Sequence, residues 1–260
     1  MSQLLTSDVL EVLRGSHERL SATLAELGEE GATLPSYDDG WSVADVASHL
    51  GSGTEIFRHY LDAGVRGEPM PGGEINRPIW DAWNAKPPTD QIRDSLAVGS
   101  SFLEAVDAMS DDERTRWRGL IFGTEMDLPA FLRMRLNEHV LHTWDVTVAL
   151  DPAATLPDAA ADVVADSLAA VAGRTGTPAG EQVSVEVRTT TPEHAFHLDL
   201  GPAGVSLSPS LDDTASASLT LPTEALVRLV YGRLDADHTP ASVSAKGVDL
   251  DQLRGAFPGL

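Results

Sequence analysis

The sequence predicts an α+β protein in two parts, a four-helix bundle followed by a small α+β domain. Up to about residue 150, four segments carry apolar residues at the three- and four-residue spacing of amphipathic helices. After about residue 180, short stretches alternate apolar and polar residues between Gly, Pro and Asp, which is typical of strands. A chain of 260 residues is long enough for two ordinary domains. We therefore assign residues 1–152 to the bundle, 153–180 to a connecting helix and linker, and 181–260 to the α+β domain.

The first two helices of the bundle have clear boundaries. An apolar stripe from Thr6 to about Leu27 ends at Gly28, and this pattern predicts the first helix. Ser42 stands three residues before Asp45 in a variant of the capping box, with Asp in place of the usual Glu or Gln, so the second helix is expected to begin there. Within this helix His49 shares a face with apolar residues, and we expect it to point into the core.

The other half of the bundle begins with a stretch rich in Gly and Pro, residues 64–88, which we interpret as a long, partly ordered loop. Its Trp80 and Trp83 either hold the loop against the bundle or line a pocket. A third helix is expected at about residues 90–109, and a fourth from Pro129, which suits a first helical turn, to about Leu150. Four amphipathic helices connected in this way favour an antiparallel four-helix bundle.

The second part is predicted from alternating patterns and turn residues. An Ala-rich helix is expected at about residues 158–172. The strand patterns are EQVSVEVRTT, HAFHLDL, GVSLSPS and ASASLTL, followed by a helix at 223–231, a short strand ASVSA and a last helix near 249–257.

The composition excludes several classes of partner and chemistry. With 18 Lys and Arg against 40 Asp and Glu, the formal charge of −22 repels nucleic acids and anionic membrane surfaces. The amino-terminal residues lack a signal-peptide pattern, and no segment stays apolar for the roughly 18 residues that a membrane span needs. We expect a cytoplasmic protein, a monomer or weak homo-oligomer. Because the chain has no cysteine, any thiol that takes part in its chemistry must come from a small molecule.

Glu138 and His142 stand four residues apart in the predicted fourth helix, so their side chains lie on one face and can reach one ion. His49 of the second helix can supply a third ligand. Two imidazoles and a carboxylate suit a catalytic divalent ion, usually zinc, with a position left for water or substrate. Such ligands also accept Ni, Co, Mn or Fe. The alternative is that Glu138 and His142 form a solvated pair and that His49 is an ordinary core histidine.

His139 lies beside Glu138 in the sequence but about a hundred degrees further round the helix. We therefore expect it to face outward or toward a neighbouring helix, and we do not count it among the ligands.

Two motifs carry a resemblance to a known family. GWSVADVASHL, together with the pattern formed by Arg135, Glu138, His142, Trp144 and Asp145, resembles the mycothiol-dependent maleylpyruvate isomerase family of actinobacteria. This family belongs to the DinB-like superfamily of metal-binding four-helix bundles. The segments LPTEALVRLVYGRLDAD and VSAKGVDLDQLRGAFPG resemble its C-terminal domain, which is related to sterol carrier proteins. The resemblance covers nearly the whole chain and implies a DinB-like bundle followed by a sterol-carrier-like domain.

The resemblance also implies a ligand set and a reaction. The family holds its ion with one His of the second helix and a Glu and a His of the fourth, which correspond to His49, Glu138 and His142. It implies Zn²⁺ as the ion and mycothiol, a low-molecular-weight thiol, as cosubstrate. The thiol adds to an activated double bond of a small electrophile, the new single bond rotates, and elimination releases the trans isomer.

Further residues are candidates for parts of this chemistry. The resemblance implies a catalytic arginine in the C-terminal domain, for which we choose Arg233; the alternative is that it merely ends a helix. Arg135 and Asp145 are expected close to the ion, where they orient ligands or hold a substrate carboxylate. The candidates for substrate binding in segment 64–88 are Arg77, Trp80 and Trp83.

Two other functions remain open at this point. The same site would also suit a mycothiol S-transferase or a metal-dependent hydrolase, in which the ion activates a thiol or water for displacement. Alternatively, the C-terminal domain would make the chain a non-catalytic carrier of small apolar ligands, with a structural ion in the bundle.

Overall fold

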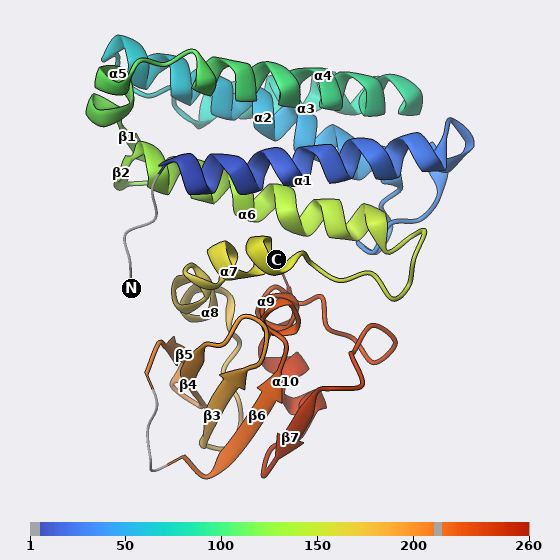
Figure 1. Cartoon of the computed structure of the whole chain (residues 1–260), viewed down its shortest axis with the longest axis vertical. Coiled ribbons are helices and arrows are strands. Elements are labelled where there is room, and N and C mark those ends of the chain that lie inside the picture. Colours follow the sequence, from blue (N-terminus) through green and yellow to red (C-terminus); the bar gives the residue numbers. More distant parts are fainter. Residues whose placement is uncertain (1–5, 211–214, 260) are drawn as a thin grey trace. The chain divides into compact units, whose positions relative to one another are not determined.

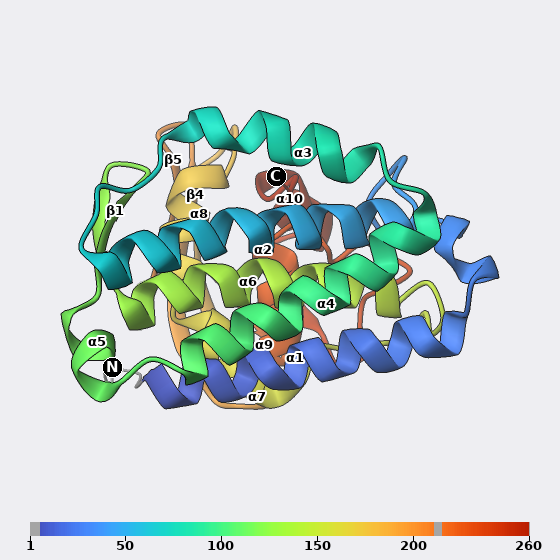
Figure 2. The same cartoon turned by 90° about the horizontal axis from the view of Figure 1, so that it is seen from above.

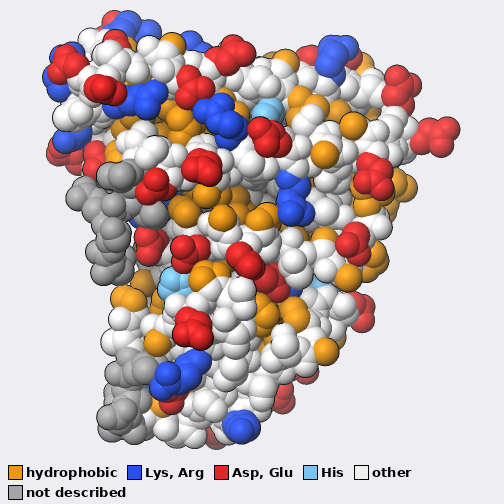
Figure 3. All heavy atoms as spheres, in the orientation of Figure 1, with side chains coloured by type: hydrophobic (Ala, Val, Ile, Leu, Met, Phe, Trp, Pro, Cys, Tyr) orange, Lys and Arg blue, Asp and Glu red, His pale blue; other side chains and the backbone are white. Residues whose placement is uncertain are grey.

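The computed structural model describes residues 6–210 and 215–259 (Figure 1). The chain divides into two compact units, Met1–Ala154 and Thr155–Leu260. The first is helical apart from one hairpin and the second contains a five-stranded sheet, which confirms the predicted α+β class. Among the described residues, no helix has the length and apolar character needed to span a membrane. Acidic side chains are spread over the visible face of both units rather than gathered in one patch (Figure 3).

The first unit is built round four long helices. They are α1 (Thr6–Leu27), α2 (Val43–Arg66), α4 (Pro88–Asp107) and α6 (Leu128–Thr147), with the shorter elements η1 (Glu30–Thr33), η2 (Gly73–Ile75), α3 (Asn76–Asn84), α5 (Asp111–Arg116), β1 (Arg118–Ile121) and β2 (Thr124–Asp127). Figure 2 shows that α3 carries the chain back between α2 and α4, which therefore run in the same direction. The helices α1 and α6 run in the opposite direction, so α2 and α6 pack antiparallel.

Local signals fix where these helices begin and end. The capping box predicted before α2 is present: the Ser42 side chain accepts from the Asp45 backbone N–H, and the Asp45 carboxylate accepts from the backbone of Ser42. The helix α1 ends before Gly28, whose φ of 64° suits glycine. Asp127 caps α6 by accepting from the Ala130 N–H at 3.0 Å. These caps satisfy backbone groups that the helices themselves leave unpaired.

A cluster of buried aliphatic residues immobilises the start of α2 beside the end of α6. Its members come from α1, α2 and α6: Leu20, Leu24, Val43, Val46, Leu50 and Val146. Because Val46 and Leu50 flank His49 in the sequence, the backbone that carries this histidine is held on its buried side by well-packed neighbours.

The prediction of a loop at residues 64–88 is wrong for most of this segment, because much of it is helical. The helix α2 continues to Arg66, and α3 forms at Asn76–Asn84. Gly and Pro are concentrated between residues 64 and 73, whereas Pro78 lies in the first turn of α3, where its missing N–H costs no hydrogen bond.

Trp83 holds α3 against α2. Its side chain is only 2% exposed, and its indole N–H donates to the Glu55 carboxylate at 2.7 Å. Gly51 makes this packing possible, because a Cβ there would lie 2.2 Å from the Trp83 ring. Trp83 is therefore a structural residue, which decides between the two roles considered for it, whereas Trp80 is 44% exposed.

A β-hairpin between α5 and α6 was not expected from the sequence. The strands β1 and β2 pair antiparallel and join through Phe122 and Gly123, which both have positive φ angles, 50° and 78°. Phe122 is 78% exposed, so its aromatic ring packs against little of the protein.

The second unit is a mixed sheet with helices. Its elements are α7 (Asp158–Ala165), α8 (Leu168–Thr175), β3 (Val183–Thr189), β4 (Ala195–Gly201), β5 (Gly204–Ser208), β6 (Ala217–Leu221), α9 (Thr223–Val230), β7 (Ser244–Lys246) and α10 (Leu250–Ala256). The sheet order is β5-β4-β3-β6-β7, with β3 and β6 parallel and the other neighbours antiparallel. The single helix expected at 158–172 is in fact two helices, both in the second unit, whereas the four longer strand patterns are confirmed.

Candidate metal centre

The antiparallel packing of α2 and α6 brings three predicted ligands together. His49 lies in the second turn of α2, and Glu138 and His142 lie in the second half of α6. The Glu138 Oε2 atom is 3.4 Å from His49 Nε2 and 3.7 Å from His142 Nε2. One ligand atom from each residue can be chosen so that all three lie within 4.8 Å of one another. The carboxylate therefore lies next to both imidazoles, whose rings also contact each other at 4.6 Å between centroids.

This donor set fits a small divalent ion. Zinc bonds to imidazole nitrogen and carboxylate oxygen are about 2.0–2.2 Å long, so two ligands of a tetrahedral ion lie about 3.4 Å apart. The distances from the Glu138 oxygen to the two nitrogens are close to this value. The side chains of His49 and Glu138 are both more than a third exposed, which leaves one side of the group open to a further ligand. The expectation that His49 points into the core is therefore wrong.

The carboxyl group of Glu138 is ionised, as a ligand must be. Burial raises its pKa, but the hydrogen bond from His49 and the charges of His142 and Arg135 outweigh this effect and lower the pKa to about 2.

Asp145 and Asp38 hold the other side of the His142 ring. The Nδ1 atom of His142 lies 2.8 Å from Asp145 Oδ2 and 3.4 Å from Asp38 Oδ2. Asp145 is fully buried. A carboxylate that accepts the Nδ1 proton leaves the Nε2 lone pair free to bind an ion.

These three residues, Asp38, His142 and Asp145, form a second group with cation-site geometry, on the opposite side of the same ring. We favour the first group, because 2.8 Å between Nδ1 and Asp145 is a direct hydrogen bond, whereas two ligands of one ion lie farther apart. Sequence reasoning did not select Asp38. Its place is fixed by backbone hydrogen bonds of its neighbours, from Tyr37 N to Asp145 O and from Trp41 N to Asp38 O.

The indole ring of Trp41 lies beside two of the three predicted ligands, His49 and His142. Its ring stacks on His142 at 6.3 Å between centroids and lies 5.5 Å from the His49 ring. The ring is partly exposed, so it is available to a molecule that enters from the open side. The sequence contained Trp41 in the GWS motif, but no spacing rule connected it to the ligands.

Comparison with known proteins identifies the family. The family model described as Mycothiol maleylpyruvate isomerase N-terminal domain matches residues 13–147, and the MDMPI C-terminal domain matches residues 158–252. The chain belongs to the mycothiol-dependent maleylpyruvate isomerase family. Two crystal structures, of the mycothiol-dependent maleylpyruvate isomerase and of a mutant of it, share this fold with a TM-score of 0.69 each. Each is 16% identical to this chain, and the match covers 96% of this chain and 98% of theirs. No curated protein matches the chain.

In this member of the isomerase family, Arg135, which was predicted to be catalytic, bonds to α2 inside the bundle. It is 3% exposed and points into the bundle. Its Nη2 atom donates to the Leu50 carbonyl at 2.9 Å and to Thr54 Oγ1 at 2.5 Å. Burial lowers its pKa to about 10, so the side chain remains a cation at neutral pH. Because Leu50 follows His49 in α2, Arg135 joins the two helices that carry the ligands.

The other site residues that the sequence predicted for this family member are Arg77, Trp80 and Arg233. Arg77 is an exposed residue of α3 paired with Asp81 at 3.5 Å. Within the described residues, neither Arg77 nor Trp80 makes a hydrogen bond, ion pair or ring contact with the three ligands. Arg233 belongs to the second unit, where it is buried and donates from Nη1 to the Tyr231 carbonyl at 3.0 Å. It follows Gly232, at which the chain leaves α9 with a φ of 74°.

Proposed function

We propose that this chain is an enzyme that isomerises a small electrophile by adding and then eliminating mycothiol, with a divalent ion, Zn²⁺ by preference, in the site on α2 and α6. The observation that carries the proposal is the convergence of His49, Glu138 and His142 at ligand distances, with one side open, in a member of this isomerase family. A divalent ion at that position would supply Lewis acidity toward a thiol or a water molecule.

The chain's own residues would hold and orient the components. His49 and His142 present Nε2 to the site, and the Glu138 carboxylate completes it. Asp145 accepts the Nδ1 proton of His142 and fixes the orientation of its ring. Trp41 lies against both imidazole rings, and its exposed part would contact a substrate that enters the site.

The absence of cysteine supports the use of an external thiol. In the proposed reaction the thiol first loses its proton to water, the thiolate sulfur bonds to one alkene carbon, and the electron pair of the double bond moves into the conjugated carbonyl. Rotation about the resulting single bond precedes elimination, in which the electron pair returns, the C–S bond breaks and the thiolate leaves and regains a proton from water. We propose that Arg77 and Trp80, both exposed on α3, bind the substrate, because a guanidinium matches the geometry of a carboxylate and an exposed aromatic ring offers apolar contact area. Arg233 stays the proposed catalytic arginine of the second unit.

The test combines metal analysis with turnover. Purified wild-type protein is expected to contain about one divalent ion per chain and to convert a cis-configured maleyl compound to its trans isomer only when mycothiol is present, as followed by ultraviolet absorbance. His49→Ala and His142→Ala are expected to lose both the ion and the turnover. His59→Ala is the matched control, because His59 lies on the same helix but is exposed, and it should keep both.

Two outcomes would change the proposal. Metal-free protein with full turnover would refute the role of the ion. Mycothiol-dependent consumption of an electrophile that yields a stable thioether would show an S-transferase, which uses the same thiol in displacement rather than in addition and elimination.

A further inference from the structure

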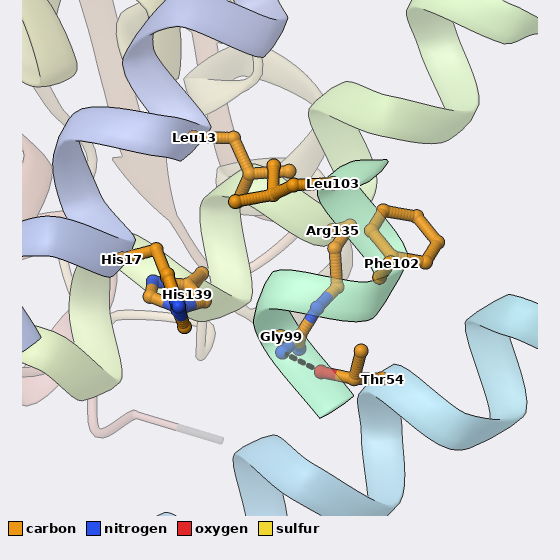
Figure 4. A pocket seen from close by; sticks show the side chains of 8 residues that line it. All are labelled: Leu13, His17, Thr54, Gly99, Phe102, Leu103, Arg135 and His139. Carbon is orange, nitrogen blue, oxygen red and sulfur yellow. Dashed lines mark hydrogen bonds between the residues drawn. The ribbon is translucent and has the colours of Figure 1, made fainter. Parts of the chain in front are cut away.

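A second polar pocket lies inside the bundle, on the side of α6 that faces α1 and α4. Its polar lining is Arg135, His139, His17 and Thr54, and Leu13 and Phe102 are among its apolar residues. Figure 4 shows the Arg135 side chain extending toward Thr54, while the rings of His17 and His139 lie together at another wall. The pocket has room for about one water-sized particle. No residue of this pocket is a ligand of the candidate metal centre.

The cation of this pocket, Arg135, has no carboxylate in direct contact among the described residues. Of the three guanidinium nitrogens of Arg135, only Nη2 has hydrogen-bond partners, Leu50 and Thr54, among the described residues. Glu138 is close enough to raise the Arg135 pKa, but no carboxylate of the described part of the chain lies within 4 Å of the guanidinium. A buried cation is strongly unfavourable unless a counter-charge or several hydrogen bonds compensate it.

His17 adds a hydrogen-bond donor to the pocket. Burial, and the neighbouring charge of Arg135, lower the pKa of His17, so its ring is neutral at pH 7. His139 Nδ1 is engaged by Ser16 Oγ at 2.8 Å. His17 Nε2 lies 3.0 Å from Ser100 Oγ, whereas its Nδ1 atom is buried and has no partner. When the Ser100 hydroxyl donates to Nε2, the ring carries its proton on Nδ1 and can donate it.

We propose that this pocket binds one small monovalent anion, of the size of chloride, between Arg135 and His17. The guanidinium of Arg135 carries one positive charge, which matches one negative charge. The small space excludes larger anions such as sulfate or a carboxylate, and the apolar side chains favour a weakly hydrated ion over a strongly hydrated one. Gly99 supports the arrangement, because a Cβ there would lie 2.6 Å from His17 Cε1 and would push the ring out of place.

Crystals of the full chain grown with sodium bromide provide the direct test, because bromide replaces chloride and scatters anomalously. We expect an anomalous peak in the pocket within hydrogen-bond distance of the Arg135 guanidinium. In solution, the thermal unfolding midpoint should rise saturably with chloride or bromide, but not with sulfate at equal ionic strength.

Variants separate binding from folding. Arg135→Gln should weaken halide binding at least about tenfold, because it removes a charge-assisted hydrogen bond. His17→Phe keeps the ring volume at a half-buried position and should weaken binding several-fold in a folded protein. Arg58→Gln, which alters an exposed ion pair with Asp62, should leave the halide effect unchanged. Water density without anomalous signal in the pocket, or an equal halide effect in all three variants, would overturn the proposal.

Discussion

The hydrogen bond between Asp145 and His142 leads to a quantitative prediction for metal affinity. Asp145 is fully buried, and its Oδ2 atom lies 2.8 Å from His142 Nδ1. Asp145→Asn keeps the size of the side chain but removes the charge that holds the ring and increases the basicity of Nε2. Loss of such a partner weakens metal binding by about 10- to 100-fold, which is about 1.4–2.7 kcal/mol. Competition for zinc against a chromophoric chelator measures this change.

Asp38→Asn is the matched control for that measurement. Asp38 contacts the same nitrogen, but at 3.4 Å and with a partly exposed side chain, so its loss should weaken zinc binding by less than about threefold. Circular dichroism would establish that both variants are folded. An affinity for Asp145→Asn within twofold of the wild type would refute the reasoning. If Asp145→Asn and Asp38→Asn lose zinc affinity equally while Glu138→Gln loses none, the ion binds in the group of Asp38, His142 and Asp145 instead.

Three further predictions concern stability. Burial lowers the pKa of His139 well below 6.5 in the folded protein. Below pH 6.5 the unfolded chain therefore binds more protons than the folded one. The free energy of unfolding should have its full value above pH 6.5 and should decrease as the pH falls toward the pKa of the folded protein. In chelator-treated protein, His139→Gln should reduce that slope by up to about 1.4 kcal/mol per pH unit, and an unchanged slope would contradict the assignment. Trp83→Ala should lower the free energy of unfolding by about 3–5 kcal/mol, whereas Trp80→Ala should change it by less than about 0.5 kcal/mol; urea titrations that give similar values would disprove the structural role of Trp83. Phe122→Asn should raise stability by up to about 1 kcal/mol, because Asn tolerates positive φ and the exposed ring contributes little packing; a lower urea midpoint would argue against it.

The long helices could be predicted because their signals are local. The stripe of α1 and the capping box of α2 lie within single segments, and the structure has both. The helix α3 is only nine residues long, which is too short for a periodicity search over a window of 11 or more residues to detect reliably. The hairpin turn at Phe122 and Gly123 lacks the usual Asn-Gly or Asp-Gly signal, so nothing in the sequence distinguished it from a loop.

The candidate site was predictable to the extent that it depends on helix geometry. The spacing of Glu138 and His142 places both on one face of α6, and a bundle places α2 beside it. Asp38 and Trp41 lie before the first residue of α2, and no periodicity relates them to α6. Their approach to His142 depends on how the chain turns between α1 and α2, which only the folded structure specifies.

Arg135 shows why the position of a residue on one helix is an incomplete guide to its chemistry. It was expected close to the ion, yet its guanidinium bonds to Leu50 and Thr54 in α2. The helix α6 thus carries two polar clusters, the candidate metal centre on one side and the pocket of Arg135 and His139 on another. Arg135 donates a hydrogen bond to the carbonyl of Leu50, the residue that follows His49, so a side chain of the pocket bonds directly to the backbone beside a proposed ligand. The two clusters share no residue, and this hydrogen bond joins them.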